Sequence, residues 1–145
     1  MAVLGTSQRP IIMPHYPHFL AEDTAVWSRY LASPVKTIRE VWYDVHVGMA
    51  VPIPEGGGEL ERRISRGVTR KRIDVVARVD SSLWVIEIKP FAGMQALGQI
   101  IAYHRMFVEE FEPVWPTWPV IICDKADYDV VSTFDALGVI VIANE

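Results

Sequence analysis

Apolar and polar residues follow each other along the chain at spacings that predict a mixture of helices and strands. Residues 22–31 begin with acidic residues and continue with apolar residues at helical spacing, which predicts an amphipathic helix. Residues 37–47 mix β-branched and aromatic residues and predict a strand. The apolar residues expected on one face of that strand are Val41, Tyr43, Val45 and Val47.

Two more strands are predicted next, over residues 73–79 and 83–89. Asp80, Ser81 and Ser82 supply a turn between them, and Pro90 is expected to close the second one. Residues 93–111 predict the longest helix of the chain. Its apolar stripe is expected to consist of Met94, Leu97, Ile101, Val108 and Phe111, with His104 on the same side.

The C-terminal part predicts a buried strand at 120–123, a helix at 127–137 and a last strand at 139–142 suited to the inside of a sheet. This order predicts an α/β sandwich with hairpin-linked first strands and helical crossovers between the later ones. We expect one domain over residues 21–145. Residues 1–20 are rich in proline and predict an extended arm that lies on this domain or on a partner.

Composition agrees with an ordinary globular domain, because 50% of the 145 residues are hydrophobic and 22% are charged. Cys123 lies in an apolar run and is expected to be a buried side chain, which indicates a reducing compartment. No apolar stretch approaches the ~20 residues of a membrane helix, and no signal segment begins the chain. The sequence therefore predicts a soluble, cytoplasmic protein without membrane contact.

The net charge of −4 argues against a protein that coats nucleic acid along its length, but six of the fourteen basic residues are clustered. Such a cluster either lines a groove that follows a phosphate backbone or forms a solvated hairpin. The residues concerned are Arg62, Arg63, Arg66, Arg70, Lys71 and Arg72.

Three charged residues are candidates for chemistry. Glu87 and Lys89 project from one face of their strand, and a tight turn brings Asp74 opposite either Lys89 or Glu87, depending on which two residues form the loop. All three then meet within about 5–8 Å. Two half-buried carboxylates repel each other unless a cation lies between them, and Mg²⁺ suits such a pair. Lys89 would hold an attacking water and offset the charge that grows on a phosphorus atom.

Simpler interpretations exist for these charges and for the ring side chains. Asp74, Glu87 and Lys89 are alternatively a surface ion-pair cluster, although their strand is otherwise apolar on both faces. Trp115 and Trp118 either stack on bases or cover an edge of the core. The histidines do not have the spacing of a zinc site; they are His15, His18, His46 and His104.

The motif Asp74, then Ile86-Glu87-Ile88-Lys89, in a helix–strand–strand–strand–helix–strand order, resembles the PD-(D/E)XK nuclease superfamily. The resemblance implies a restriction-endonuclease-like three-layer sandwich, with a mixed central sheet flanked by helices. It further implies that Asp74, Glu87 and the carbonyl of Ile88 bind Mg²⁺ or Mn²⁺, and that Lys89 acts on the nucleophilic water.

The pair Gln99 and Tyr103 has the Gln-x-x-x-Tyr spacing that RecB-like members carry on the helix after the lysine strand. These residues either touch DNA and organise the active site or belong to a polar outer face of the helix. The superfamily often uses an acid from the first helix. The candidate is Glu22, with Glu40 second.

Two functions follow. The first is a metal-dependent DNA endonuclease or exonuclease that serves recombination, repair or phage DNA processing. The second is a non-catalytic structural or adaptor protein with a nuclease fold, located in a larger assembly such as a phage particle. In that case the N-terminal arm would contact further copies or other proteins, and the location would be the virion.

Overall fold

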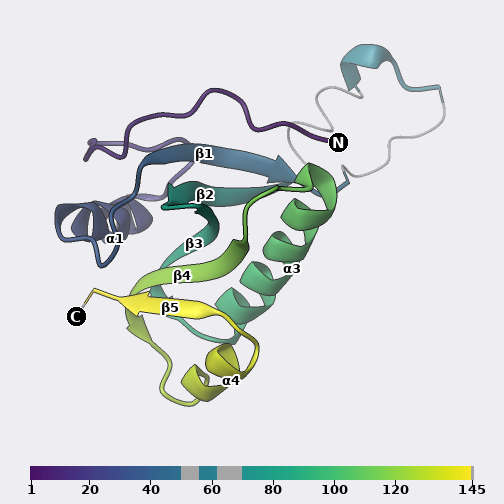
Figure 1. Cartoon of the computed structure of the whole chain (residues 1–145). Helices are drawn as coiled ribbons and strands as arrows, with labels where there is room; N and C mark the ends of the chain where they lie inside the picture. Colours follow the sequence, from purple (N-terminus) through teal and green to yellow (C-terminus); the bar gives the residue numbers. More distant parts are fainter. Residues whose placement is uncertain (50–55, 62–69, 145) are drawn as a thin grey trace.

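The computed structural model of the protein describes residues 1–49, 56–61 and 70–144. A five-stranded mixed sheet with helices on both faces forms its body (Figure 1). In chain order the elements are α1 (Ala21–Ala32), β1 (Glu40–Val47), β2 (Lys71–Val79), β3 (Ser82–Ala92), α3 (Met94–Phe111), β4 (Thr117–Ala126), α4 (Val131–Ala136) and β5 (Ile140–Ala143). The predicted α/β architecture is therefore confirmed.

The strands lie side by side in the order in which they occur in the chain. β1, β2 and β3 are antiparallel neighbours, as expected of hairpin-linked strands. β3, β4 and β5 are parallel neighbours, and α3 and α4 provide the crossovers that parallel strands need. The predicted change from hairpins to crossovers is thus confirmed.

Two apolar clusters hold the helices against opposite faces of the sheet. On one face Trp27 of α1 packs in a cluster with Ile86 of β3. On the other face Phe107 of α3 and Phe134 of α4 pack in a cluster with Val85 of β3. Because consecutive β3 residues point to opposite faces, one strand supplies side chains to both clusters. β3 is therefore the central element of the structure.

The predicted apolar stripe of α3 is correct only in part: Leu97 and Phe111 pack against the cluster under α3, but Met94, Ile101 and Val108 are exposed. Met94 is 77% exposed and Ile101 is 37% exposed, whereas the buried side of the helix carries Ala96, Ile100 and Phe107. Both sets recur at three- and four-residue steps, so the spacing alone does not choose between them. Packing against the sheet buries the second set, so the side of the helix that faces β3 is rotated from the predicted one.

The expected single apolar face of β1 is also wrong. Val41 packs in the cluster under α1, but Val45 and Val47 pack in the cluster under α3. Asp44, which lies between them, has a φ of 54°. This left-handed residue breaks the strict alternation of a strand, so the face presented to each helix changes at Asp44.

Two predictions are wrong: the position of the last strand in the sheet and the residue at which β3 ends. The last strand was expected inside the sheet, but β5 lies at its edge, where Ile140 and Ala143 are exposed. β3 does not end at Pro90 and continues to Ala92. Pro90 is tolerated there because the pairing with β2 ends at Ile86, so its missing N–H has no β2 partner to lose.

The N-terminal arm, residues 1–20, lies along the outer edge of β1 (Figure 1). Gln8 and Val41 exchange two backbone hydrogen bonds, and the indole of Trp42 donates to the Gly5 carbonyl at 2.8 Å. Tyr16 is buried against α1, where its hydroxyl lies 2.9 Å from that of Ser28. The arm therefore packs on the body, which was one of the two expected positions.

Cys123 is buried, as expected. Within the described part of the chain, every helix is too short or too polar to cross a membrane.

Candidate active site

The candidate site lies where β2 and β3 separate. Val79 pairs with Ser82, so the loop consists of Asp80, with a φ of 53°, and Ser81. This is the second of the two registers considered from the sequence, and it sets Asp74 level with Glu87. The pairing of the two strands ends one residue earlier, at Val75 and Ile86.

A side chain replaces the strand pairing at this point. Oδ2 of Asp74 accepts a hydrogen bond from the backbone N–H of Ile88 at 2.9 Å. Residues of an antiparallel pair normally exchange backbone bonds here, and an unpaired backbone donor inside the protein would be costly. Asp74 therefore satisfies the β3 backbone while it keeps the two strands apart.

The two carboxyl groups lie close together in a poorly hydrated place. Glu87 is 5% exposed, and burial, followed by the charge of Asp74, raises its pKa to about 9. Burial also raises the pKa of Asp74 to about 6, against the lowering effect of the Ile88 N–H. The charge of Asp74 thus opposes the ionisation of Glu87, whereas a hydrogen bond with Glu87 lowers the pKa of Asp74. Oε2 of Glu87 is buried and has no hydrogen-bond partner among the described residues.

Lys89 provides a cationic group beside Glu87. Its Nζ lies 3.9 Å from Oε1 of Glu87, and both side chains project from the same face of β3, as predicted. Ile86 and Ile88 point to the opposite face, into the cluster under α1. The apolar setting and the burial of Glu87 do not fit a solvated surface cluster of ion pairs.

A third acid approaches from α1, but it is neither of the two expected. Burial raises the pKa of Asp23, and this carboxylate interacts electrostatically with Lys89, Asp74 and Glu87. Glu22 is exposed beside it. Glu40 lies at the far end of β1, where it pairs with Arg78 at 3.2 Å.

Helical spacing contains the signal that would have identified Asp23. It precedes the buried residues Val26, Trp27 and Tyr30 by three, four and seven positions, so it continues their stripe toward the sheet. Glu22 is one position off that stripe, which turns it to solvent.

Gln99 and Tyr103 lie on the inner side of α3, not on a polar outer face. Tyr103 packs against the core cluster under α3, and its pKa is raised by burial and by the charges of Glu87 and Asp74. Oε1 of Gln99 is buried, and within the described ranges it meets no hydrogen-bond partner. Gln95, one turn earlier, is exposed. Gln99 and Tyr103 therefore face the sheet, and Tyr103 lies near the two carboxylates.

The basic cluster is divided. Arg62, Arg63 and Arg66 lie outside the described residues. Lys71 is exposed, whereas Arg70 is engaged in structural contacts: its Nη2 lies 3.2 Å from Oε2 of Glu110, and its Nε donates to the Gly48 carbonyl at 2.9 Å.

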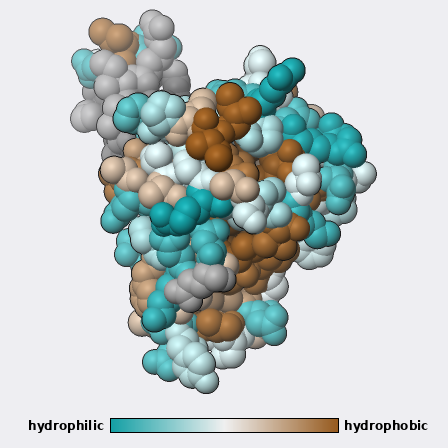
Figure 2. All heavy atoms as spheres, turned by 90° about the vertical axis from the view of Figure 1, so that its left-hand side faces the viewer, coloured by the Kyte–Doolittle hydropathy of each residue, from teal (hydrophilic) through white to brown (hydrophobic). Residues whose placement is uncertain are grey.

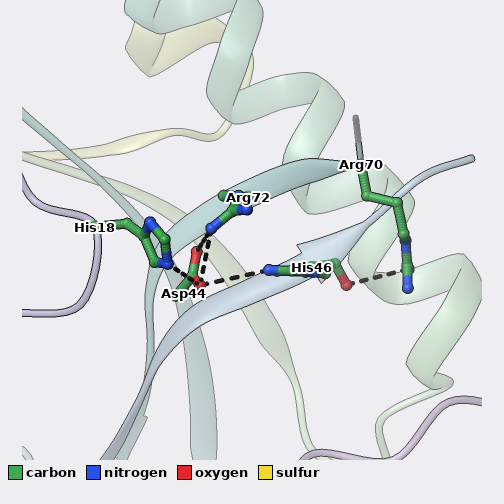
Figure 3. Close-up of polar contacts among 5 residues, drawn as sticks. All are labelled: His18, Asp44, His46, Arg70 and Arg72. Carbon is green, nitrogen blue, oxygen red and sulfur yellow. Dashed lines mark hydrogen bonds and ion pairs between the residues drawn. The ribbon is translucent and has the colours of Figure 1, made fainter. Parts of the chain in front are cut away.

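Arg72 belongs to a cluster that the sequence did not reveal (Figure 3). Its Nη1 lies 3.2 Å from Oδ2 of Asp44, and the Nε2 atoms of His18 and His46 lie 3.2 Å and 3.4 Å from the same oxygen. The three donors come from the arm, β1 and β2, which are distant in the chain.

The remaining ring side chains have structural contacts. Nε2 of His104 lies 2.8 Å from the Thr117 carbonyl. The Trp115 ring packs against the core with the Arg78 guanidinium 4.4 Å from its centre, so it covers an edge of the core. Trp118 is about half exposed.

The carboxylates of the site are the candidate ligands for a metal ion. Among residues 1–49, 56–61 and 70–144, no group of three or more His, Cys, Asp and Glu side chains is placed to hold a metal ion. Magnesium needs fewer, since it keeps several waters and accepts one or two carboxylates. Asp74 and Glu87 meet that smaller requirement. Comparison of the chain with protein-family models, curated proteins and solved structures gave no match.

Proposed function

We propose that the protein is a metal-dependent DNA nuclease with a restriction-endonuclease-like fold of the PD-(D/E)XK type. The observation that carries the proposal is the closeness of the Asp74 and Glu87 carboxyl groups at the point where β2 and β3 separate. Burial and the charge of Asp74 raise the pKa of Glu87, so two ionised carboxylates in this place destabilise the fold. A site that retains this cost, with an amine beside it, is typical of function.

A divalent cation fits these residues. Asp74 and Glu87 would hold it, and the carbonyl of Ile88 is a further candidate because its N–H already faces the gap beyond the end of the β2 pairing. Oε2 of Glu87, which is buried and meets no hydrogen-bond donor among the described residues, supports the same assignment. Mg²⁺ or Mn²⁺ would supply Lewis-acid polarisation of the phosphoryl oxygens and an acidified water.

The other residues of the site have roles set by their contacts. Lys89, whose ammonium is 3.9 Å from Glu87, would hold the nucleophilic water and offset negative charge on the phosphate. Asp23 would orient Lys89 from α1. Tyr103 and Gln99 close the site from α3 and limit the access of water to the carboxyl groups.

Cleavage assays test the proposal. The purified chain is incubated with linear and circular DNA in Mg²⁺ or Mn²⁺, beside Glu87→Gln and Lys89→Ala. The matched controls are Glu109→Gln and Lys36→Ala, which make the same substitutions at exposed residues. We expect cleavage by the wild type and both controls and a loss of about 100-fold or more in the two site variants. Equal cleavage by all five proteins would reveal a contaminating nuclease, and inert wild type would reject the proposal.

A structural or adaptor role is the second candidate, and the exposed apolar residues of the arm favour it. Figure 2 looks onto the side that carries α1 and shows separate apolar areas among hydrophilic ones. The exposed apolar residues of the arm and of the turn after α1 include Ile11, Ile12, Leu20 and Val35. If the wild type is inert on DNA but assembles with itself or a partner, and if Ile11→Ser with Ile12→Ser prevents assembly, the adaptor role replaces the nuclease.

A further inference from the structure

Three basic side chains converge on the carboxylate of Asp44 (Figure 3). His18 comes from the arm, His46 from β1 and Arg72 from β2, and each places a nitrogen within 3.4 Å of Oδ2 of Asp44. Arg72 also contacts Oδ1 at 3.3 Å. We call these four residues the Asp44 cluster.

The Asp44 cluster lies beside the candidate active site. The β1–β2 pairing, which joins Val45 to Ile73, sets Asp44 level with Asp74. Arg72 lies two positions from Asp74 along β2, which is about 7 Å. The Asp44 cluster therefore lies one strand away from the two carboxyl groups of the candidate site.

The basic groups of the cluster are accessible and its acid is not. Asp44 is 15% exposed, against 30% for Arg72, 31% for His46 and 61% for His18. The carboxylate is covered by its donors and holds them in place, much as a carboxylate orients a histidine ligand. Any group that arrives from solvent meets nitrogen donors first.

The backbone at this place is strained. His18 and Asp44 have φ values of 62° and 54°, in the left-handed region that side chains other than glycine rarely adopt. Strain of this kind persists where the surroundings enforce it and gathers at ligand sites. Here it brings an arm residue and a strand residue to one point.

We propose that the Asp44 cluster binds a phosphate of the DNA backbone next to the scissile phosphate of the proposed nuclease site. The inference rests on the proposed nuclease function and extends it to a substrate subsite. Arg72 would supply charge-assisted hydrogen bonds to the phosphate oxygens, since a guanidinium has five donors in a fork. His46 and His18, whose Nε2 atoms contact the same carboxylate, would lie beside that phosphate. Asp44 is a positioning residue.

The competing explanation is a latch, in which His18 and Asp44 merely fasten the arm to the sheet. The two explanations predict opposite effects of Asp44→Asn. A latch loses contacts and gains no ligand affinity. A phosphate subsite loses a nearby negative charge and binds DNA more tightly.

Binding of a short labelled DNA duplex is measured without divalent metal, in the Glu87→Gln background, over a series of salt concentrations. We expect Arg72→Gln and His46→Gln to weaken binding, Arg72→Gln by about tenfold, and to lower the salt slope by about one unit for each lost phosphate contact. Asp44→Asn should tighten binding about threefold. Arg105→Gln, exposed on the outer side of α3, is the control and should bind like the parent. A parallel series on duplex RNA tells which backbone is preferred.

The outcomes separate this inference from the nuclease proposal. If Arg72→Gln and His46→Gln bind like the parent, the subsite is rejected even when the wild type cleaves DNA. If Asp44→Asn binds as weakly as Arg72→Gln, the latch is correct and the subsite is rejected. If binding depends on Arg72 and rises in Asp44→Asn while the wild type cleaves nothing, the subsite stands and the nuclease fails. Thermal melting of each variant checks that the fold is intact.

Discussion

Asp74 and Ile88 are joined by a hydrogen bond that takes the place of a strand pair. Oδ2 of Asp74 lies 2.9 Å from the Ile88 nitrogen; Asp74 is one position beyond the last paired residue of β2, and Ile88 is two positions beyond that of β3. The bond fixes the carboxylate beside Glu87 and directs the Ile88 backbone into the opening between the strands. One residue thus has a structural role and a proposed ligand role at the same place.

This double role predicts different results for two substitutions of Asp74. Asp74→Ala leaves the Ile88 N–H without its acceptor and should lower the free energy of unfolding by about 1–3 kcal/mol. Asp74→Asn keeps an oxygen acceptor and removes a buried charge, so its free energy of unfolding should stay within about 1 kcal/mol of the wild type. Denaturant unfolding of both variants measures this. Equal destabilisation would show that the bond to Ile88 contributes little.

Glu87 should make the metal-free protein less stable as the pH rises. Its pKa is raised from 4.5 to about 9, so the folded state binds more protons than the unfolded state between these values. The free energy of unfolding then falls as the pH increases through this window. Glu87→Gln removes the effect and should raise the melting temperature at about pH 8 by roughly 5 °C.

The control for that prediction is Glu109→Gln, an exposed carboxylate on the outer side of α3. It should leave both the melting temperature and its pH dependence unchanged. If Glu87→Gln melts below the wild type at every pH, the Glu87 carboxyl stabilises the fold, and our explanation of its raised pKa is wrong.

Metal binding should become tighter as the pH rises, because a cation competes with protons for both carboxylates. The pKa values of Asp74 and Glu87 are raised to about 6 and about 9, so affinity for Mn²⁺ should increase across this range. At a metal concentration of about 100 times the dissociation constant, the fold gains about 2.7 kcal/mol. Thermal melts with and without Mn²⁺ measure the gain, which Glu87→Gln should abolish. A gain that does not depend on pH would place the metal elsewhere.

Much of this arrangement follows from local sequence. The turn residues and apolar runs predicted the β2–β3 hairpin and the common face of Glu87 and Lys89, because both depend on contacts between near neighbours. The sequence allows two registers for this hairpin, because either Asp80 with Ser81 or Ser81 with Ser82 can form its two-residue loop. The positive φ of Asp80 belongs to the loop that the structure uses.

What the sequence did not predict depends on contacts between distant segments. The side of α3 that faces the sheet is decided by packing on β3, and two stripes of equal spacing compete for it. The Asp44 cluster joins residues 18, 44, 46 and 72, whose meeting requires the arm and two strands to be placed first. The change of face in β1 arises from one left-handed residue that no periodic pattern contains.

The orientation of α3 has its own test in two adjacent isoleucines. Ile100 is fully buried, so Ile100→Ala should lower the free energy of unfolding by about 2–5 kcal/mol. Ile101 is 37% exposed, and Ile101→Ala should cost less than about 1.5 kcal/mol. Urea unfolding of the two variants gives the comparison. The reverse order would restore the stripe expected from the sequence and turn Gln99 and Tyr103 away from the carboxylates.

Whether Asp74 and Glu87 bind a metal ion is tested by a crystal structure of the protein soaked in Mn²⁺ near pH 8, with anomalous scattering recorded at a wavelength where manganese contributes. We expect an anomalous peak between the carboxylates of Asp74 and Glu87, and its disappearance in crystals of Glu87→Gln. A peak only at another position, or no manganese between Glu87 and Asp74 after a complete soak, would contradict a metal site at these two residues.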